Sequence, residues 1–369
     1  MKIRRIIIAG LGLIGGSLAK AFRRTNSGFE IIGVEKDKDS RDLALEDGTV
    51  NRAYETVEDA ASAITDSQVV FLCTPVSGIP GLLKALGDIA RPGTILTDVG
   101  SVKVRIMEEA ARILPKDICF IGGHPMAGAE QSGYPASRAH LFENAYYVLT
   151  PPPGTPEEIR KSLELLIAST GALPLILDPL THDRKVGSVS HLPHIIAAAL
   201  VNTVREADGP DRAALKLAAG GFKDITRIAS SDPEMWRDIC LSNREQLMPL
   251  LAGVIRHLSR FGRALESNEA PEIEAFYRDA KAFRDRLPSL DSLYLLPCYE
   301  VYVDVEDKPG IIGQVTTLLG NHNVNIKNIR IINSREEEPG CLVLSLTDPE
   351  AQDKALALLT REGCRAYKR

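Results

Sequence analysis

Residues 122–133, GGHPMAGAEQSG, place one histidine and one glutamate among small residues. Pro125 follows His124, which favours extended backbone at the histidine and keeps it out of a helix. Because Gly122 and Gly123 have no side chains, we expect the segment to expose the histidine. An imidazole with a pKa of about 6.5 can accept a hydroxyl proton while a hydride leaves the same carbon. The sequence therefore predicts that His124 is a general base, although a histidine that only hydrogen-bonds its loop would look the same.

A glycine-rich stretch near the start of the chain predicts a dinucleotide site. GLGLIGGS follows an apolar run and begins a helical pattern, and Gly10, Gly12 and Gly15 fit G-x-G-x-x-G. These glycines allow a tight turn and close approach of a pyrophosphate, while the helix N-terminus faces the phosphates. Glu35 lies 20 residues after Gly15, where a carboxylate binds ribose hydroxyls and favours NAD over NADP, unless it is simply solvated. Lys36 weakens that preference. The expected cofactor-binding residues are Gly10, Gly12, Leu13, Ile14, Gly15, Glu35, Thr74 and Ser101.

We expect a wound parallel sheet to position these residues. Continuous apolar runs alternate with helical segments, which is typical of strands buried on both faces of an α/β sheet. The expected strands are residues 3–10, 29–35, 68–75, 93–101 and 118–125, extended by 145–151 and 172–178. Ligands bind beyond the carboxyl ends of such strands, so Thr74, Ser101 and His124 should share a crevice with the glycine loop. Ser101 could orient His124 or the nicotinamide, or cap the helix that follows. Glu130 could support the site or cap a helix.

The second half of the chain has the period of helices from residue 179 to about residue 286. Residues 192–204 and 247–265 are the clearest helices, and we expect the apolar residues 195–201 to be deeply buried in a domain that forms a homodimer. His191 and His194 lie three residues apart at an expected helix start. No further ligands complete a metal site, so we predict no metal and assign both histidines to substrate binding, with core or capping roles as the alternative. His182 is expected to make an interdomain or surface contact.

Residues 220–239 combine glycines and cations before a well-signalled helix, with Asp232 as the N-cap and Pro233 at the first helical position. Arg227 is the predicted ligand of a substrate carboxylate because a guanidinium can bind it with two parallel hydrogen bonds. Arg237 and Lys223 are weaker candidates, and all three could instead form surface or dimer ion pairs. Trp236 is expected mainly to pack.

The last part of the chain has the strand and helix order βαββαβ, which is typical of a ferredoxin-like α+β unit. The fold class is therefore an α/β Rossmann domain, an all-α domain and a small α+β domain. We expect the boundaries 1–178, 179–288, a linker at 289–297, and 298–369. The 369 residues carry a net charge of −5, with 44% hydrophobic and 25% charged residues. This balance predicts a protein that binds neither nucleic acid nor membrane. The six cysteines are scattered without a CxxC pair, which predicts reduced thiols and a cytoplasmic location.

The motifs GLGLIGGS, TDVGSVK, GGHPMAGAEQSG, SHLPH and GGFKDITRIASSDPEMWRDI occur in an order that closely resembles the prephenate dehydrogenase family. The resemblance covers roughly residues 1–288 and implies NAD-dependent oxidative decarboxylation of prephenate to 4-hydroxyphenylpyruvate in tyrosine biosynthesis. It implies that His124 is the catalytic histidine, that Ser101 supports it and the nicotinamide, and that Arg227 holds a substrate carboxylate. His194 and Glu130 match residues that line or gate the pocket. Glu35 stands where the family commonly has aspartate.

VEDKPGIIGQVTTLLGNHNVNIKNIRI resembles an ACT domain, a module that commonly binds amino acids. The resemblance suggests feedback inhibition by tyrosine, although the domain could serve dimerisation alone. The expected regulatory residues are Asp307, Pro309, Gly310, Asn323 and Asn325. Two other functions stay open: arogenate dehydrogenase, which has the same chemistry with an amino group in place of the keto group, and a sensor that binds NAD and an amino acid without turnover.

Overall fold

The computed structural model describes residues 3–129, 131–209, 212–286, 299–305, 308–332 and 340–368. Two compact units divide the chain, Met1–Gly262 and Arg263–Arg369. Two of the predicted site residues, Glu130 and Asp307, and the whole of the expected linker 289–297 lie outside the described residues. No described helix is both long and apolar enough to cross a membrane.

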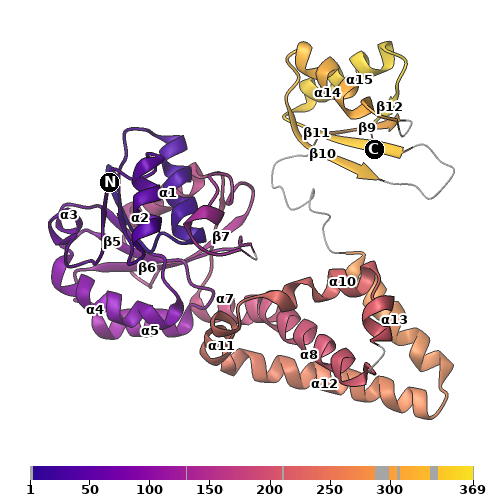
Figure 1. Cartoon of the computed structure of the whole chain (residues 1–369), viewed down its shortest axis with the longest axis horizontal. Coiled ribbons are helices and arrows are strands. Elements are labelled where there is room, and N and C mark those ends of the chain that lie inside the picture. The colour runs from indigo at the N-terminus through magenta and orange to yellow at the C-terminus, as the bar shows by residue number, and fades with distance from the viewer. Residues whose placement is uncertain are drawn as a thin grey trace. The chain divides into compact units, whose positions relative to one another are not determined.

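An eight-stranded sheet forms the first part of the unit Met1–Gly262 (Figure 1). Its strand order is β3-β2-β1-β4-β5-β6-β7-β8, the winding of a dinucleotide-binding fold. The strands are β1 (Arg5–Ala9), β2 (Glu30–Val34), β3 (Arg52–Tyr54), β4 (Val69–Leu72), β5 (Ile95–Asp98), β6 (Cys119–Pro125), β7 (Tyr146–Thr150) and β8 (Leu173–Ile176). The seven expected strands are all present. The short strand β3 was not predicted, because three residues give no periodic signal.

Helices cover both faces of this sheet because alternate strand residues enter two separate apolar cores. In β1, Ile6 and Ile8 belong to one core, whereas Ile7 and Ala9 belong to the other. The first core includes residues of helices α1 (Leu13–Thr25), α2 (Lys38–Glu46) and α6 (Glu157–Ser169), and the second includes residues of α3 (Ala61–Thr65), α4 (Ile79–Ile89) and α5 (Val104–Ile113). Burial on both faces explains why the strands are continuously apolar.

The expectation of a wholly parallel sheet is wrong at β7. Strand β7 pairs antiparallel with β6 and parallel with β8, so the last two strands run against the others. Between β6 and β7 the described residues contain only the short 3-10 turn η2 (Tyr134–Ala136). A parallel return needs a long crossover connection, usually a helix, whereas a chain without one can turn back beside the strand it has just left.

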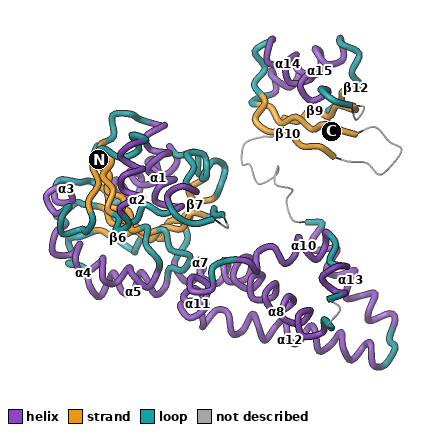
Figure 2. Tube along the Cα trace, in the orientation of Figure 1, coloured by secondary structure: helices purple, strands orange, loops and turns teal. Residues whose placement is uncertain are grey.

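From residue 179 to the end of the first unit, the described residues form helices alone (Figure 2). These are α7 (Pro179–Val186), the π-helical turn η3 (Gly187–His191), α8 (Leu192–Ala207), α9 (Ala213–Leu217), α10 (Gly220–Thr226), the 3-10 turn η4 (Arg227–Ser230), α11 (Pro233–Ser242) and α12 (Arg244–Glu266), which continues past Gly262. The predicted helices α8 and α12 are confirmed. Deep burial of residues 195–201 is not, because only Ala197 is buried. Asp232 caps α11 as predicted by accepting a hydrogen bond from the Met235 amide.

The second unit contains helix α13 (Ala270–Arg284) and the predicted ferredoxin-like domain. The domain consists of β9 (Tyr299–Val305), α14 (Ile311–Asn321), β10 (Ile326–Ile332), β11 (Gly340–Leu346), α15 (Pro349–Arg361) and β12 (Arg365–Tyr367). Its sheet is antiparallel with the order β10-β11-β9-β12. One face packs against both helices around Val303, Leu319, Leu344 and Leu359. The βαββαβ prediction is therefore confirmed.

Candidate active site

The strand order brings the predicted site residues to one edge of the sheet. Strands β1, β4, β5 and β6 are neighbours and run in the same direction. Gly10 follows β1 directly, and Thr74 lies two residues after the end of β4. Ser101 lies three residues after β5, and His124 is the last residue but one of β6. All four therefore lie near the carboxyl ends of adjacent strands, where an α/β sheet binds its ligand.

The glycine loop is shaped to receive a pyrophosphate. Gly10 has a φ of +104°, and a Cβ on Gly15 would lie 1.9 Å from the Gly10 carbonyl oxygen. Both positions therefore need glycine. Leu13 and Ile14 form the first turn of α1, which begins after Gly12 without a hydrogen bond from a capping side chain. The N–H groups at this helix end, and the helix dipole, favour a bound anion.

Glu35 and Thr74 also suit a bound dinucleotide. The Glu35 carboxylate accepts hydrogen bonds from the Leu11 amide at 2.8 Å and the Asp37 amide at 3.0 Å. It thereby braces the glycine loop, and a carboxylate retains further lone pairs for ribose hydroxyls. The Thr74 hydroxyl oxygen is buried without a hydrogen-bond partner among the described residues. These residues fit NAD.

His124 is buried, contrary to the prediction of an exposed histidine. Only 8% of its surface is accessible, because β6 remains a strand through Pro125 and pairs with β7 on one side. Its glycines serve this packing. A Cβ on Gly123 would lie 2.4 Å from the carbonyl oxygen of Asp98, and one on Gly122 would lie 2.3 Å from the hydroxyl of Thr150. The two glycines therefore allow the neighbouring strands to pack closely against β6. They do not expose the histidine to solvent.

A chain of hydrogen bonds fixes the orientation and tautomer of His124. Its Nδ1 lies 2.8 Å from Nε2 of His182, whose own Nδ1 lies 2.7 Å from a carboxylate oxygen of Asp183. A carboxylate only accepts, so a neutral His182 carries its hydrogen on Nδ1 and accepts from His124 through Nε2. His124 must then donate from Nδ1, which leaves its Nε2 with a lone pair and no partner among the described residues. That nitrogen is the acceptor that a general base requires.

Asp183 is held in turn by the start of α5. Its carboxylate accepts hydrogen bonds from the Lys103 amide at 2.6 Å and the Val104 amide at 2.9 Å. These amides lie at the N-terminus of α5, where the helix dipole stabilises a negative charge. Asp183 and His182 lie in α7 and are 1% and 0% exposed. A surface role for His182 is therefore wrong. Asp183, not Ser101, caps α5, so the alternative of a serine cap is also wrong.

A buried ion pair holds the backbone beneath His124. The ammonium of Lys103 pairs with Asp98 and also donates to the Gly123 carbonyl oxygen at 2.6 Å. Asp98 accepts from the amides of Gly100 and Gly123 at 2.8 and 3.0 Å. Both charged side chains are fully buried. This network ties the end of β5 to β6 immediately before the histidine.

Burial lowers the pKa of His124 well below its ordinary value, and the neighbouring Lys103, His182 and His191 disfavour a positive charge on the ring in the same direction. The ring is therefore neutral at neutral pH, in the form that accepts a proton. Burial likewise lowers the pKa of His191 to about 4. Both histidines are uncharged over the range in which the enzyme would work.

His191 and His194 lie beside Trp236. His191 ends the π-helical turn and is 1% exposed, whereas His194 is half-buried in the first turn of α8. The His194 ring stacks on Trp236 with centroids 3.7 Å apart, and the His191 ring meets the same tryptophan edge-on at 5.9 Å. A hollow of about 510 Å³ is lined by His194, Trp236 and Arg237 together with apolar residues of α8. Trp236 therefore packs as predicted, but against the two histidines.

The predicted cations lie outside this buried cluster. Arg227 begins η4 and is exposed, as is Lys223 in α10. Arg237 is also exposed and pairs with Asp238 at 2.9 Å. The described residues contain no group of three or more histidine, cysteine or acidic side chains arranged to hold a metal ion.

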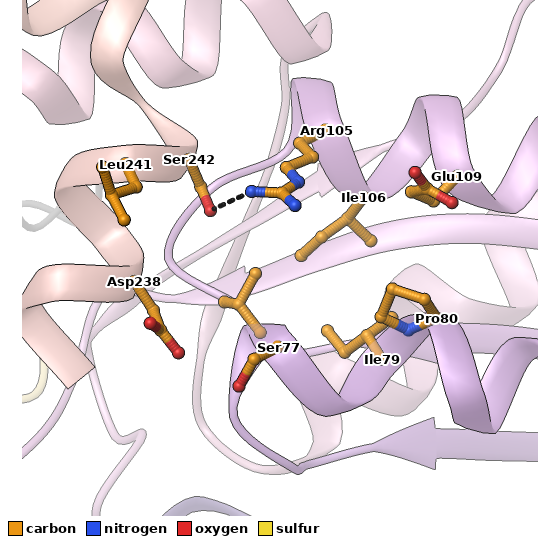
Figure 3. Close-up of a pocket in the computed structure, with 10 residues that line it drawn as sticks. Ser77, Ile79, Pro80, Arg105, Ile106, Glu109, Asp238, Leu241 and Ser242 are labelled. Atoms are coloured by element: carbon orange, nitrogen blue, oxygen red, sulfur yellow. Dashed lines mark hydrogen bonds between the residues drawn. The ribbon is translucent and has the colours of Figure 1, made fainter. Parts of the chain in front are cut away.

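A second cavity marks the junction between the sheet domain and α11 (Figure 3). It has a volume of about 280 Å³ and lies between α4, α5 and α11. Arg105 of α5 reaches across it to the Ser242 hydroxyl at 3.4 Å, and Asp238 faces Ser77 (Figure 3). In addition, Ile239 of α11 and the partly buried Trp236 pack in a core of the sheet. These contacts fix α11, and with it Trp236, against the dinucleotide domain.

In the second unit, the loop before α14 forms a shallow hollow of about 450 Å³ lined by residues 308–313, which include Pro309 and Gly310. Gly310 has a φ of +89° and precedes the helix without a side-chain cap. Asn323 also has a positive φ, +56°, in the turn that leads through Asn325 to β10. This hollow belongs to the ferredoxin-like domain itself.

A wound sheet with a nucleotide cradle and a neutral, oriented histidine at its carboxyl edge defines an NAD-dependent oxidoreductase. Residues 18–173 match the nucleotide-binding domain of prephenate dehydrogenase, residues 178–279 its dimerization domain, and residues 299–363 the ACT domain. The chain therefore belongs to the prephenate dehydrogenase family. The match to a dimerization domain supports the predicted homodimer.

Relatives align over most of the chain. A prephenate dehydrogenase of Bacillus subtilis is 36% identical, over 95% of this chain and 94% of its own length. The structure of an Aquifex aeolicus prephenate dehydrogenase in complex with hydroxyphenyl propionate and NAD+ superimposes with a TM-score of 0.73 at 32% identity, covering 78% of this chain and 99% of that one. A Synechocystis arogenate dehydrogenase superimposes with a TM-score of 0.66 at 33% identity, over 77% and 100% of the two chains.

Proposed function

We propose that this chain catalyses the NAD-dependent oxidative decarboxylation of prephenate to 4-hydroxyphenylpyruvate, a step of tyrosine biosynthesis. The observation that carries the proposal is the Asp183–His182–His124 chain, which presents a neutral imidazole acceptor beside the nucleotide cradle. Family membership supplies the substrate class, and the Bacillus subtilis relative is named for prephenate.

His124 would move one proton twice. Its Nε2 accepts the proton of the ring hydroxyl, while bound NAD supplies the acceptor for the hydride that leaves the same carbon. Loss of the ring carboxylate as CO2 then makes the ring aromatic and returns negative charge to the oxygen, which takes the proton back from Nε2. The lowered pKa of His124 favours this return. During the intermediate stage, the Nδ1–H bond to His182 and the Asp183 charge behind it stabilise the imidazolium.

Other predicted residues would bind and orient the reactants. We propose that Ser101 hydrogen-bonds His124 or the nicotinamide amide, because it follows β5, the strand that pairs with β6 on which His124 lies. Arg227, which is exposed at the start of η4, would hold a substrate carboxylate. His194, on the face of Trp236, would line the ring pocket. Glu130 retains its proposed gating role from the family resemblance.

The test is to mix the purified chain with NAD and prephenate and to follow the absorbance of NADH. Turnover that is lost in His124→Asn, with NAD binding retained, is the expected result. NAD binding without turnover of prephenate or arogenate would contradict the proposal and favour a sensor. Turnover of arogenate alone would support the same mechanism and identify arogenate as the substrate. This substrate should be measured because the chain is also similar to the Synechocystis arogenate dehydrogenase.

We also propose that tyrosine inhibits the enzyme through the ACT domain. The uncapped start of α14 beside Pro309 and Gly310 could receive the carboxylate of an amino acid, and Asn323 or Asn325 would lie near a dimer seam. Asp307, just before these residues in the sequence, is a further candidate for binding the effector. Truncation after residue 297 should abolish inhibition by tyrosine and leave turnover of prephenate. Equal inhibition of the full and truncated chains would contradict this proposal. We also propose that the enzyme is cytoplasmic, because its six cysteines are scattered along the chain without a paired motif, as is common for reduced thiols.

A further inference from the structure

We propose that Asn243 holds His191 as a neutral Nε2–H donor, and that this N–H, with the indole N–H of Trp236, binds a carboxylate of the substrate. The proposal rests on the proposed function and assigns a specific chemical role to a pair of residues at that site. Asn243 is the positioning residue, since it acts through His191.

The orientation of the Asn243 side chain follows from its two contacts. Asn243 ends α11 and is 2% exposed. Its Nδ2 lies 2.9 Å from the carbonyl oxygen of Asp183 and 3.0 Å from Nδ1 of His191. A backbone carbonyl can only accept, so the amide nitrogen, and not the amide oxygen, must face it. The second hydrogen of that nitrogen is then directed to His191.

The tautomer of His191 follows in turn. Because Nδ1 accepts from Asn243, a neutral ring carries its hydrogen on Nε2. The lowered pKa of His191, to about 4, keeps the ring neutral. His191 is therefore the opposite of His124, which carries its hydrogen on Nδ1. One ring is fixed as a donor and the other as an acceptor, and both are fixed through Asp183, one by its carboxylate and the other by its backbone carbonyl.

The donor on His191 has no acceptor among the described residues. Its Nε2 is buried and unpaired, and so is Nε1 of Trp236. The two rings form a T-shaped pair with their centroids 5.9 Å apart. A contact with the face of an aromatic ring is a weak substitute for a hydrogen bond. Leaving a buried donor unpaired is costly, so two such donors on neighbouring rings indicate a ligand that accepts. A carboxylate has two oxygens and only accepts, which matches two neutral N–H groups.

The position of these donors favours the substrate as that ligand. His124 is linked to Asp183 through His182, and His191 is linked to the same residue through Asn243, so the two rings lie in one hydrogen-bonded cluster. His194 is stacked on the same tryptophan and lines the hollow of about 510 Å³. A substrate whose hydroxyl lies at His124 would therefore bring its other polar groups close to His191 and Trp236.

The tautomers can be measured without turnover. In protein labelled with 15N-histidine, the seven histidines can be assigned by substituting each in turn, and nitrogen shifts distinguish protonated from unprotonated ring nitrogens. We expect His191 to be protonated at Nε2 and His124 at Nδ1. In Asn243→Asp, a carboxylate faces His191 and should move its hydrogen to Nδ1. A native His191 protonated at Nδ1 would overturn the proposal, whatever the enzyme's activity.

The carboxylate contact is tested by two matched variants. Glutamine places its amide nitrogen near the position of Nε2, whereas asparagine is too short and reaches only the position of Nδ1. His191→Gln should retain most of the affinity, and His191→Asn should raise the KM for prephenate about 10- to 100-fold, as expected for a lost hydrogen bond to a charged group. The kcat should change much less than the KM, because the bond is present before and during the reaction.

Binding of 3-(4-hydroxyphenyl)propionate, measured by calorimetry in the presence of NAD, locates the carboxylate. Weaker binding of this probe to His191→Asn, with unchanged binding of 4-ethylphenol, assigns the contact to the side-chain carboxylate. A raised KM for prephenate with unchanged binding of the probe assigns it to the ring carboxylate. If neither quantity differs between His191→Asn and His191→Gln, His191 does not bind a carboxylate.

Discussion

Replacing His182 with leucine tests whether its hydrogen bond to His124 contributes to catalysis. In the ground state the bond joins two neutral rings 2.8 Å apart. When His124 takes the substrate proton, the same bond becomes a charge-assisted one, which contributes about 1.5–3 kcal/mol. Loss of that contribution in the transition state should lower kcat about 10- to 150-fold. The KM should stay within a few-fold of the native value, because His182 is not proposed to touch the substrate.

A smaller second effect comes from the tautomer. The buried Nδ1–H of His124 would lose its acceptor, at a cost of about 1–3 kcal/mol, and rings with the hydrogen on Nε2 would become populated. Such rings cannot accept a proton from the substrate. The total loss should nevertheless stay below that of His124→Asn, because removal of a general base costs about 100- to 10,000-fold.

The assay is steady-state kinetics with prephenate and NAD, together with the Kd for NAD as a check that the dinucleotide domain is intact. His257→Leu, the same substitution at an exposed position of α12, is the matched control and should retain native kinetics. A His182→Leu enzyme with a kcat within twofold of native would refute the reasoning, because the orientation of His124 would then not depend on this bond. An equal rise in KM and fall in kcat would mean that the pocket itself had collapsed.

Three further predictions follow from the same geometry. Gly15→Ala should weaken NAD binding at least tenfold in calorimetry, because the new Cβ would lie 1.9 Å from the Gly10 carbonyl oxygen; near-native affinity would mean that the turn can rearrange. Lys103→Met should lower the free energy of unfolding by about 3–5 kcal/mol in urea titrations, since it leaves the Asp98 charge buried without its partner; a loss under 1 kcal/mol would contradict this account of the pair. The pKa of His191 falls to about 4 on folding from about 6.5 in the unfolded chain, so the unfolded state binds more protons as the pH drops. The free energy of unfolding should therefore fall by about 3 kcal/mol between pH 6.5 and 4 through this residue, and His191→Gln should remove that part of the pH dependence; identical profiles would contradict the assignment.

Local sequence patterns predicted most of the fold. The glycine loop, the capped start of α11 and the βαββαβ order each depend on residues close together in the chain, and all three are confirmed. Strand direction was harder, because an apolar run reads the same in either direction. The reversal at β7 follows from the absence of a crossover helix, which the sequence signals only weakly.

The candidate site was only partly predictable. His124 was found because glycine and proline residues surround it, but its burial depends on β7 and α7, which approach from distant parts of the sequence. His182, Asp183 and Asn243 were missed, since no spacing relates them to His124. The one local signal was an adjacent histidine and aspartate just after the Asp178–Pro179 helix start. The His182–Asp183 pair indicates a catalytic role only when the fold shows that His182 lies against the ring of His124.

The dual attachment of Asp183 links local stability to proton transfer. The same carboxylate that orients His182, and through it His124, also accepts from the amides of Lys103 and Val104. If α7 separates from α5, these amides are exposed to solvent and the base loses its orientation in the same event. Hydrogen exchange at the first turn of α5 would therefore report the fraction of molecules in which the active site is assembled, in the absence of any substrate.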